Sequence, residues 1–96
     1  MLTIANQADG TITVKGRLDA ASAPEAQQFL DGHDGACILD MQALEYISSA
    51  GLGVLLKTHK RLVGAGGALK LINVSAHIND IFGYSGFDKL FDITPA

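Results

Sequence analysis

The stretch that decides the fold is Ala36–Leu56, which reads ACILDMQALEYISSAGLGVLL. It opens with a short, continuous apolar run that ends at Asp40. Such a run is typical of a strand that is buried on both faces and is therefore central in a sheet. A linker follows, and two serines, Ser48 and Ser49, precede a glycine and a new apolar pattern with helical spacing. The stretch therefore predicts a central strand, a linker and a helix that begins near the serines.

The helix that begins near the serines is predicted to be the longest in the chain. Its apolar face consists of residues that recur at helical spacing: Leu52, Leu55, Leu56, His59, Leu62 and Val63. The other face is expected to carry four polar side chains: Lys57, Thr58, Lys60 and Arg61. Glycines at positions 64, 66 and 67 are expected to end this helix.

The residues before the central strand predict a hairpin and a short helix. Leu2–Ala5 and Thr11–Val14 alternate apolar and polar residues on either side of a tight turn, as paired strands do. Gly16–Ala21 is predicted to be a loop. Ser22–Glu25 has the spacing of a capping box, which satisfies the first backbone N–H groups of a helix. Gly32 is expected to end that helix.

The residues after the long helix predict a strand, a third helix and a closing segment. Ala68–Val74 is the second candidate for a buried strand, and Ser75 is placed to cap the helix that follows. Lys89–Ile93 closes the chain as a short strand or turn. Strands that alternate with helices favour an α/β fold in which helices cover a partly parallel sheet. A chain of 96 residues suits one domain, so residues 1–96 are expected to form a single unit.

Composition and charge exclude several classes of protein. The chain has seven basic and ten acidic residues and a net charge of −3, without a basic cluster, so nucleic-acid binding is not expected. Cys37 is the only cysteine, and no internal disulfide can form. The N-terminus does not have the pattern of a signal peptide, and no apolar run approaches the roughly 20 residues that span a bilayer. We therefore expect a cytoplasmic domain without direct membrane insertion.

Catalytic, metal and cofactor sites find little support in the sequence. His33, His59 and His77 lack the clustered spacing of zinc ligands. The segment SSAGLG lacks the glycine that a nucleophile elbow needs two residues before the serine, because Ile47 stands there. The GAGG segment that begins at Gly64 lacks the Lys-Ser/Thr of a phosphate-binding loop. No catalytic residue, metal or cofactor is therefore expected.

The two serines at the start of the long helix have a structural and a functional interpretation. Ser48 or Ser49 is expected to act as an N-cap, which stabilises a helix by roughly 1 kcal/mol. A helix N-terminus also carries partial positive charge and free N–H donors, so it tolerates an anion. A phosphate there would add about −1.5 to −2 charges at pH 7 and change what binds to that surface. The residues alone leave both interpretations open.

Three segments, taken in order, resemble one known family over nearly the whole chain. Ala36–Leu56 combines an apolar strand ending in Asp with a Ser-Ser-Ala-Gly-Leu-Gly motif that opens a helix. Val14–Glu25 (VKGRLDAASAPE) contains a G-x-L-D strand end and loop, and Leu69–Ile93 supplies a strand, a helix and a closing segment. This pattern resembles STAS domains, the family of anti-sigma factor antagonists. The resemblance implies a mixed sheet of four to five strands with about three to four helices packed on it.

The resemblance also implies which residues carry the function. The serine that is phosphorylated in the family falls on Ser49. The family often has an acid at the preceding position, where this chain has Ser48, an adjacent hydroxyl and the alternative site of modification. The implied partner-binding residues lie in the two loops, at the end of the central strand and on the long helix: Asp19, Ser22, Asp40, Tyr46, Ile47, Ser48, Ala50, Gly51 and Lys57.

The mechanism that the resemblance implies is partner switching by a non-enzymatic domain. The unmodified domain would bind an anti-sigma factor that is also a serine protein kinase of the histidine-kinase-like ATPase type. The kinase would phosphorylate Ser49 and release the domain, and a metal-dependent serine phosphatase would reset it. One alternative is a constitutive scaffold, such as an accessory subunit of a membrane transport complex, in which Ser49 is only a helix cap. A small enzyme or nucleotide-binding domain that uses the serine loop is the other alternative.

Overall fold

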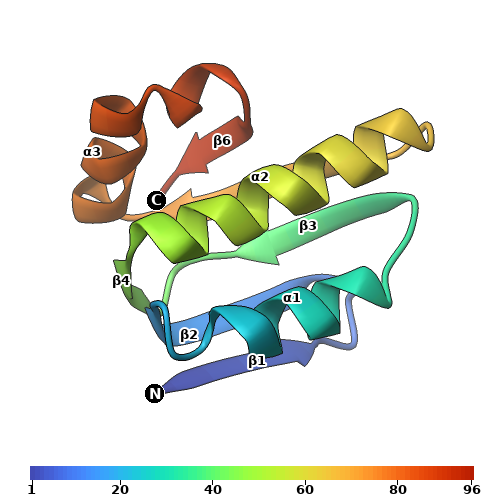
Figure 1. The fold of residues 1–96 in the computed structure, drawn as a ribbon, viewed down its shortest axis with the longest axis horizontal. Coiled ribbons are helices and arrows are strands. Elements are labelled where there is room, and N and C mark those ends of the chain that lie inside the picture. The colour runs from blue at the N-terminus through green and yellow to red at the C-terminus, as the bar shows by residue number, and fades with distance from the viewer.

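The computed structural model describes residues 1–96 and shows one mixed sheet with helices packed against it (Figure 1). In chain order the elements are β1 (Leu2–Asn6), β2 (Ile12–Leu18), α1 (Ala23–Asp31), β3 (Ala36–Asp40), β4 (Leu44–Ile47), α2 (Ser49–Gly64), β5 (Ala68–Val74), α3 (Ala76–Ser85), a short 3₁₀ helix (Phe87–Lys89) and β6 (Asp92–Pro95). None of the helices is long and apolar enough to cross a membrane.

The sheet has the strand order β1-β2-β3-β5-β6. β4 lies outside this order and pairs with the C-terminal end of β2, at Gly16–Leu18. β1 and β2 are antiparallel, whereas every other pair is parallel. The α/β class and the mixed sheet agree with the prediction. The six strands exceed the expected four to five because Leu44–Ile47, predicted as part of a linker, pairs with β2 and buries Leu44 and Ile47.

The helices cover one face of the sheet. α1 and α2 lie side by side in front of the strands, and α3 packs near β4 at one end (Figure 1). On β3, Cys37 and Leu39 are buried, whereas Ala36 is exposed and Ile38 is half-buried. The prediction of a strand buried on both faces is therefore wrong for β3, although the strand is central as expected. Cys37 and Leu39 lie on the face of the sheet that the helices cover. Ala36 and Ile38 lie on the other face, which no helix covers.

The long helix α2 is buried more widely than its sequence pattern indicated. Thr58, predicted on the polar face, has 0% of its surface exposed and accepts a hydrogen bond from Gln27 Nε2 at 3.2 Å. Val63, predicted on the apolar face, is 52% exposed. α2 contacts α1 as well as the sheet, so its buried arc is broader than one stripe. Leu62, beside Val63, is 1% exposed, so the buried arc continues to the last turn of α2 and Val63 lies outside it.

The helix caps follow the sequence in two cases of three. The Ser48 and Ser75 hydroxyls accept hydrogen bonds from the backbone N–H groups of Gly51 and Ile78, as N-caps do. The capping box predicted at Ser22–Glu25 is wrong, because Ser22 makes no side-chain cap. The Ser22 hydroxyl is instead directed back toward the end of β2, which continues to Leu18 through residues predicted to be a loop.

Candidate functional site

The candidate site lies where the carboxyl ends of β2 and β4 meet the start of α2. The Ser48 N–H donates to the Leu18 carbonyl oxygen at 2.9 Å, which extends the pairing of β2 with β4. Gly51, in the first turn of α2, packs directly on this junction. A Cβ at Gly51 would lie 2.7 Å from the Leu18 carbonyl oxygen and 2.8 Å from Cγ1 of Ile47. Glycine is therefore what lets the helix begin so close to the strand ends.

The two serines at this junction differ in what their hydroxyls do. Ser48 is half-buried and extended (φ −93°, ψ 176°), and its Oγ accepts the Gly51 N–H at 3.3 Å. Ser49 is exposed and is the first residue of α2, and its hydroxyl makes no hydrogen bond within the chain. The first backbone N–H groups of a helix have no acceptor inside it and favour a nearby anion. Ser49 is thus the accessible hydroxyl of the pair.

Asp19 organises the loop that follows β2. Its Oδ1 accepts the backbone N–H groups of Ala21 and Ser22, each at 3.1 Å, and lies 3.1 Å from the Ser22 hydroxyl. The hydrogen bond from the Ser22 N–H is the main cause that holds the pKa of Asp19 below its ordinary value. The Ser22 hydroxyl also accepts the Asp19 N–H at 3.0 Å. Asp19 and Ser22, both predicted as partner-binding residues, therefore fix each other next to the serines.

Arg17 is a residue of this site that the sequence analysis missed. Its guanidinium carbon lies 4.3 Å from the centre of the Tyr46 ring, on the neighbouring strand. Its Nε lies 3.8 Å from Oδ2 of Asp19, a loose ion pair. Alternation along β2, continued one residue beyond its end at Leu18, puts Arg17 and Asp19 on the same side. This signal was available in the sequence but was hidden by the prediction of a loop over residues 16–21.

Asp40 is held by contacts of its own at the end of β3. Its Oδ1 accepts the Gln42 N–H at 3.0 Å and Nδ2 of Asn73 at 3.2 Å. Asn73, on β5, has a positive φ of 55° and therefore adopts the left-handed conformation. Asp40 thus stabilises the turn between β3 and β4 and makes no hydrogen bond to either serine.

The remaining predicted site residues divide by burial. Ile47 is 2% exposed and Gly51 is also buried, so both support the site from beneath, and their contact with a partner stays a prediction. The cause of their burial is the close packing of the first turn of α2 on β2 and β4. Tyr46 and Ala50 are half-buried at the surface, and Lys57 is exposed further along α2.

Metal binding and thiol chemistry find few suitable side chains in this structure. No three His, Cys, Asp or Glu side chains lie close enough together to hold a metal ion. Cys37 is buried, and this burial raises the pKa of its thiol. The junction itself offers an exposed hydroxyl at a helix N-terminus, and the adjoining end of β2 carries a fixed carboxylate and a guanidinium. Such a site suits covalent modification of the hydroxyl and recognition by another protein.

Comparison with known proteins identifies the fold and its relatives. The sequence profile of the STAS domain matches residues 3–96. The anti-sigma-B factor antagonist of Bacillus subtilis is 32% identical over 92 residues, which span 93% of this chain and 84% of that protein. A STAS-domain containing protein of Pseudomonas aeruginosa is 29% identical, with 97% of this chain and 98% of that protein covered.

Solved structures show the same fold. The crystal structure of an anti-sigma factor antagonist from Mycobacterium paratuberculosis superimposes with a TM-score of 0.82 at 22% identity, over 100% of this chain and 86% of that one. SpoIIAA in its unphosphorylated form gives a TM-score of 0.71 at 17% identity, over 100% and 89%. Because the profile covers nearly the whole chain and the relatives agree with it, this protein belongs to the STAS domain family and resembles its anti-sigma factor antagonists.

Proposed function

We propose that this protein is a partner-switching regulator whose state is set by phosphorylation of Ser49. The unmodified domain binds an anti-sigma factor that is a serine protein kinase of the histidine-kinase-like ATPase type. Phosphorylation releases the domain, and a metal-dependent serine phosphatase restores the hydroxyl. The observation that carries the proposal is the exposed, uncommitted hydroxyl of Ser49 at the first position of α2. The domain is the substrate in this cycle and catalyses nothing itself.

The difference between the two serines supports Ser49 as the acceptor. Phosphorylation of Ser48 would turn the Oγ that accepts the Gly51 N–H into a more crowded ester oxygen and would place a charged group at a half-buried position. Phosphorylation of Ser49 leaves that cap intact and places the phosphate beside N–H groups without helical acceptors. The Ser49 oxygen bonds to the γ-phosphorus of ATP as the bond to ADP breaks, and its proton passes to a base of the kinase. The fold is therefore expected to survive modification at Ser49.

Charge explains why the modified domain would be released. A surface that fits its partner around a neutral hydroxyl must accommodate about −1.5 to −2 additional charges after phosphorylation. Asp19 already places a carboxylate in the neighbouring loop, and its lowered pKa keeps it ionised at neutral pH. Like charges brought together in an interface cost affinity. Binding and modification are thus opposed without a change of fold.

The test is phosphopeptide mass spectrometry of the protein purified from its native cells. Wild type is compared with Ser49→Ala and Ser48→Ala, each expressed at the same level. We expect phosphate on Ser49 in wild type and in Ser48→Ala, and none in Ser49→Ala. A purified serine kinase from the same cells should bind the unmodified domain and phosphorylate it with ATP.

The other outcomes are equally informative. Phosphate confined to Ser48 would keep the switch but would overturn the assignment of its acceptor. Absence of phosphate under every growth condition would contradict the proposal and would favour the constitutive scaffold, for instance an accessory subunit of a membrane transport complex. Circular dichroism of both variants serves as a control, because an unfolded variant would lose its phosphate trivially.

A further inference from the structure

The guanidinium of Arg17 is held at the site but donates no hydrogen bond there. Its contacts are the face of Tyr46, at 4.3 Å from the ring centre, and Asp19, at 3.8 Å from Nε to Oδ2. An exposed cation–π contact contributes about 0.5–1 kcal/mol and an exposed ion pair contributes little. Half of the Arg17 side chain is exposed. All five N–H donors of the guanidinium therefore remain available for another acceptor.

The position of Arg17 relative to Ser49 follows from the strand register. Arg17 and Tyr46 are paired residues of β2 and β4, and the Ser48 N–H bonds the Leu18 carbonyl at the next step. Ser49 follows directly, about three extended residues or 10 Å along the chain from Tyr46. An arginine and a phosphoserine side chain that lean toward each other cover such a distance. Arg17 is also the only basic residue in the two segments that form the junction, 16–22 and 44–51.

We propose that Arg17 turns from Tyr46 and Asp19 to bind the phosphate of phosphorylated Ser49 within the same chain. This proposal rests on the proposed phosphorylation of Ser49 and adds the residue that responds to it. Arginine suits the role because its planar fork donates two parallel hydrogen bonds to a phosphate, which are stronger than neutral ones. The contacts given up are weak, so the exchange is favourable. In the unmodified domain the same guanidinium is free to meet a carboxylate of the partner.

The proposal makes phosphorylation change two features of the surface at once. A negative group is added at Ser49, and the Arg17 guanidinium is withdrawn from the partner. Removal of Arg17 should therefore weaken binding of the unmodified domain and should also shrink the effect of the phosphate. We expect the ratio of dissociation constants, phosphorylated over unmodified, to fall about tenfold in Arg17→Gln, which corresponds to about 1.4 kcal/mol.

A direct test uses the full chain with phosphoserine incorporated at position 49 during translation. Phosphorus NMR measures the second pKa of the phosphate, which is ordinarily about 6. A guanidinium in contact with the phosphate lowers this pKa, so Arg17→Gln should raise it by about 0.5 to 1 unit. Lys15→Gln is the matched control, because Lys15 is exposed on the same side of β2, two residues farther from the junction. This control should move the pKa much less.

Two acids of the junction, Asp19 and Glu45, and the N-terminus of α2 also act on the pKa of the phosphate. They are present in every variant, so the pKa difference between wild type and Arg17→Gln isolates the effect of Arg17. Asp19 and Glu45 raise the pKa, whereas the helix N-terminus lowers it. Equal shifts in Arg17→Gln and Lys15→Gln, or no shift in either, would overturn the role of Arg17. The incorporated phosphoserine needs no kinase, so this result is independent of whether cells phosphorylate Ser49.

Discussion

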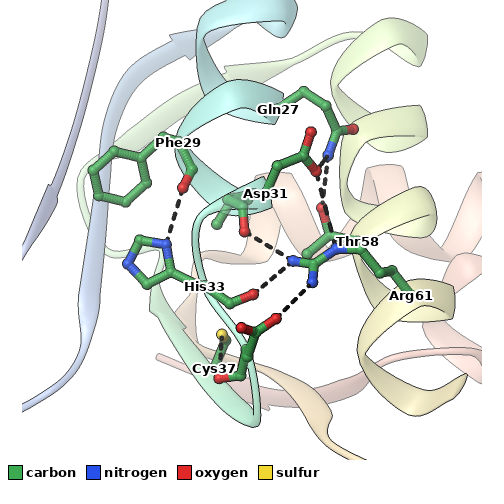
Figure 2. Close-up of polar contacts among 9 residues, drawn as sticks. Gln27, Phe29, Asp31, His33, Cys37, Thr58 and Arg61 are labelled. Atoms are coloured by element: carbon green, nitrogen blue, oxygen red, sulfur yellow. Dashed lines mark hydrogen bonds and ion pairs between the residues drawn. The ribbon is translucent and has the colours of Figure 1, made fainter. Parts of the chain in front are cut away.

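The two ends of α2 use arginine in opposite ways. Near the C-terminal end, Arg61 Nη2 donates to the carbonyl oxygens of Leu30 at 2.9 Å and His33 at 2.7 Å, and Nη1 donates to Asp34 at 3.1 Å (Figure 2). At the N-terminal end, Arg17 lies over an aromatic ring and donates no hydrogen bond. Both residues carry the same charge, but only Arg61 is committed to the backbone.

The commitment of Arg61 has a structural cause. The last carbonyl groups of a helix have no intrahelical donor, and a cation near them is favourable. Arg61 supplies donors to the end of α1 and to the loop before β3, while Nδ1 of His33 bonds the Phe29 carbonyl oxygen (Figure 2). Nε2 of His33 bonds Oδ1 of Asn6 at 2.8 Å. This end of the molecule is tied together by side chains. The other end has the free donors of Arg17 and the free hydroxyl of Ser49, as the proposed switching surface requires.

Alanine at each arginine gives the largest expected contrast. Arg61→Ala should lower the free energy of unfolding by about 2–3 kcal/mol, because two backbone carbonyls lose charged hydrogen bonds. Arg17→Ala should change it by less than about 1 kcal/mol, since its contacts with Tyr46 and Asp19 are exposed. Urea denaturation measures both values. Arg61→Lys, which keeps the charge but not the fork, should recover only part of the loss. Similar losses at the two positions would remove the contrast.

Gly51→Ala tests whether the N-terminal end of α2 depends on its close backbone packing on β2 and β4. The added methyl group would meet the Leu18 carbonyl and the Ile47 side chain at under 3 Å, so α2 must shift. We expect a loss of about 1–3 kcal/mol in unfolding free energy, the usual cost of overpacking. Gly53→Ala is the matched control, because a Cβ at Gly53 meets nothing within 4 Å. This control should be neutral or stabilising, since alanine favours helix.

The two serines give a smaller but sharper difference. Ser48→Ala removes the cap of α2 and should cost about 1 kcal/mol of unfolding free energy. Ser49→Ala removes a hydroxyl without a partner and should stay within about 0.5 kcal/mol. Thermal and urea unfolding of both variants provide the measurement. A larger loss for Ser49 than for Ser48 would mean that the assignments of cap and free hydroxyl are reversed.

The smallest effect concerns pH and Asp19. Its pKa in the folded protein lies below the ordinary value near 3.8, chiefly because of the Ser22 N–H. Its stabilising effect is therefore complete above that value and is lost as the pH falls through the lowered pKa of the folded state. The stability difference between wild type and Asp19→Asn should shrink as the pH drops below about 4. Asp80→Asn, whose carboxylate makes no hydrogen bond, controls for general charge effects. An unchanged difference at acid pH would contradict the assigned hydrogen bonds.

Much of the fold could be predicted from patterns among residues that are close together in the sequence. The caps at Ser48 and Ser75, the strand that ends at Asp40 and the helix that ends at Gly64 depend on residues close together in the chain. Such features follow from backbone preferences and from periodicity, which a single sequence displays. The position of Ser49 at the start of α2 was predictable for the same reason.

Features that depend on distant packing were not predictable in this way. Thr58 is buried because Gln27 and α1 cover it, 31 residues earlier in the chain. Ile38 is half-buried because no helix covers its face of the sheet. The contact of Arg17 with Tyr46 requires the register of β2 on β4, which shifts between Gly16 and Arg17. These are properties of the assembled sheet, and residue patterns alone do not fix them.

The close seat of Gly51 on the Leu18 carbonyl has a kinetic consequence. Because backbone contacts hold the start of α2 in place, the proposed switching surface exists before any partner arrives. When the binding-competent conformer is already the main one, association is not slowed or weakened by a small population of that conformer. Encounters should then proceed at roughly 10⁵–10⁷ M⁻¹s⁻¹, as for other rigid protein pairs. Differences in affinity between partners would then lie mainly in the dissociation rate of the complex between this domain and its partner.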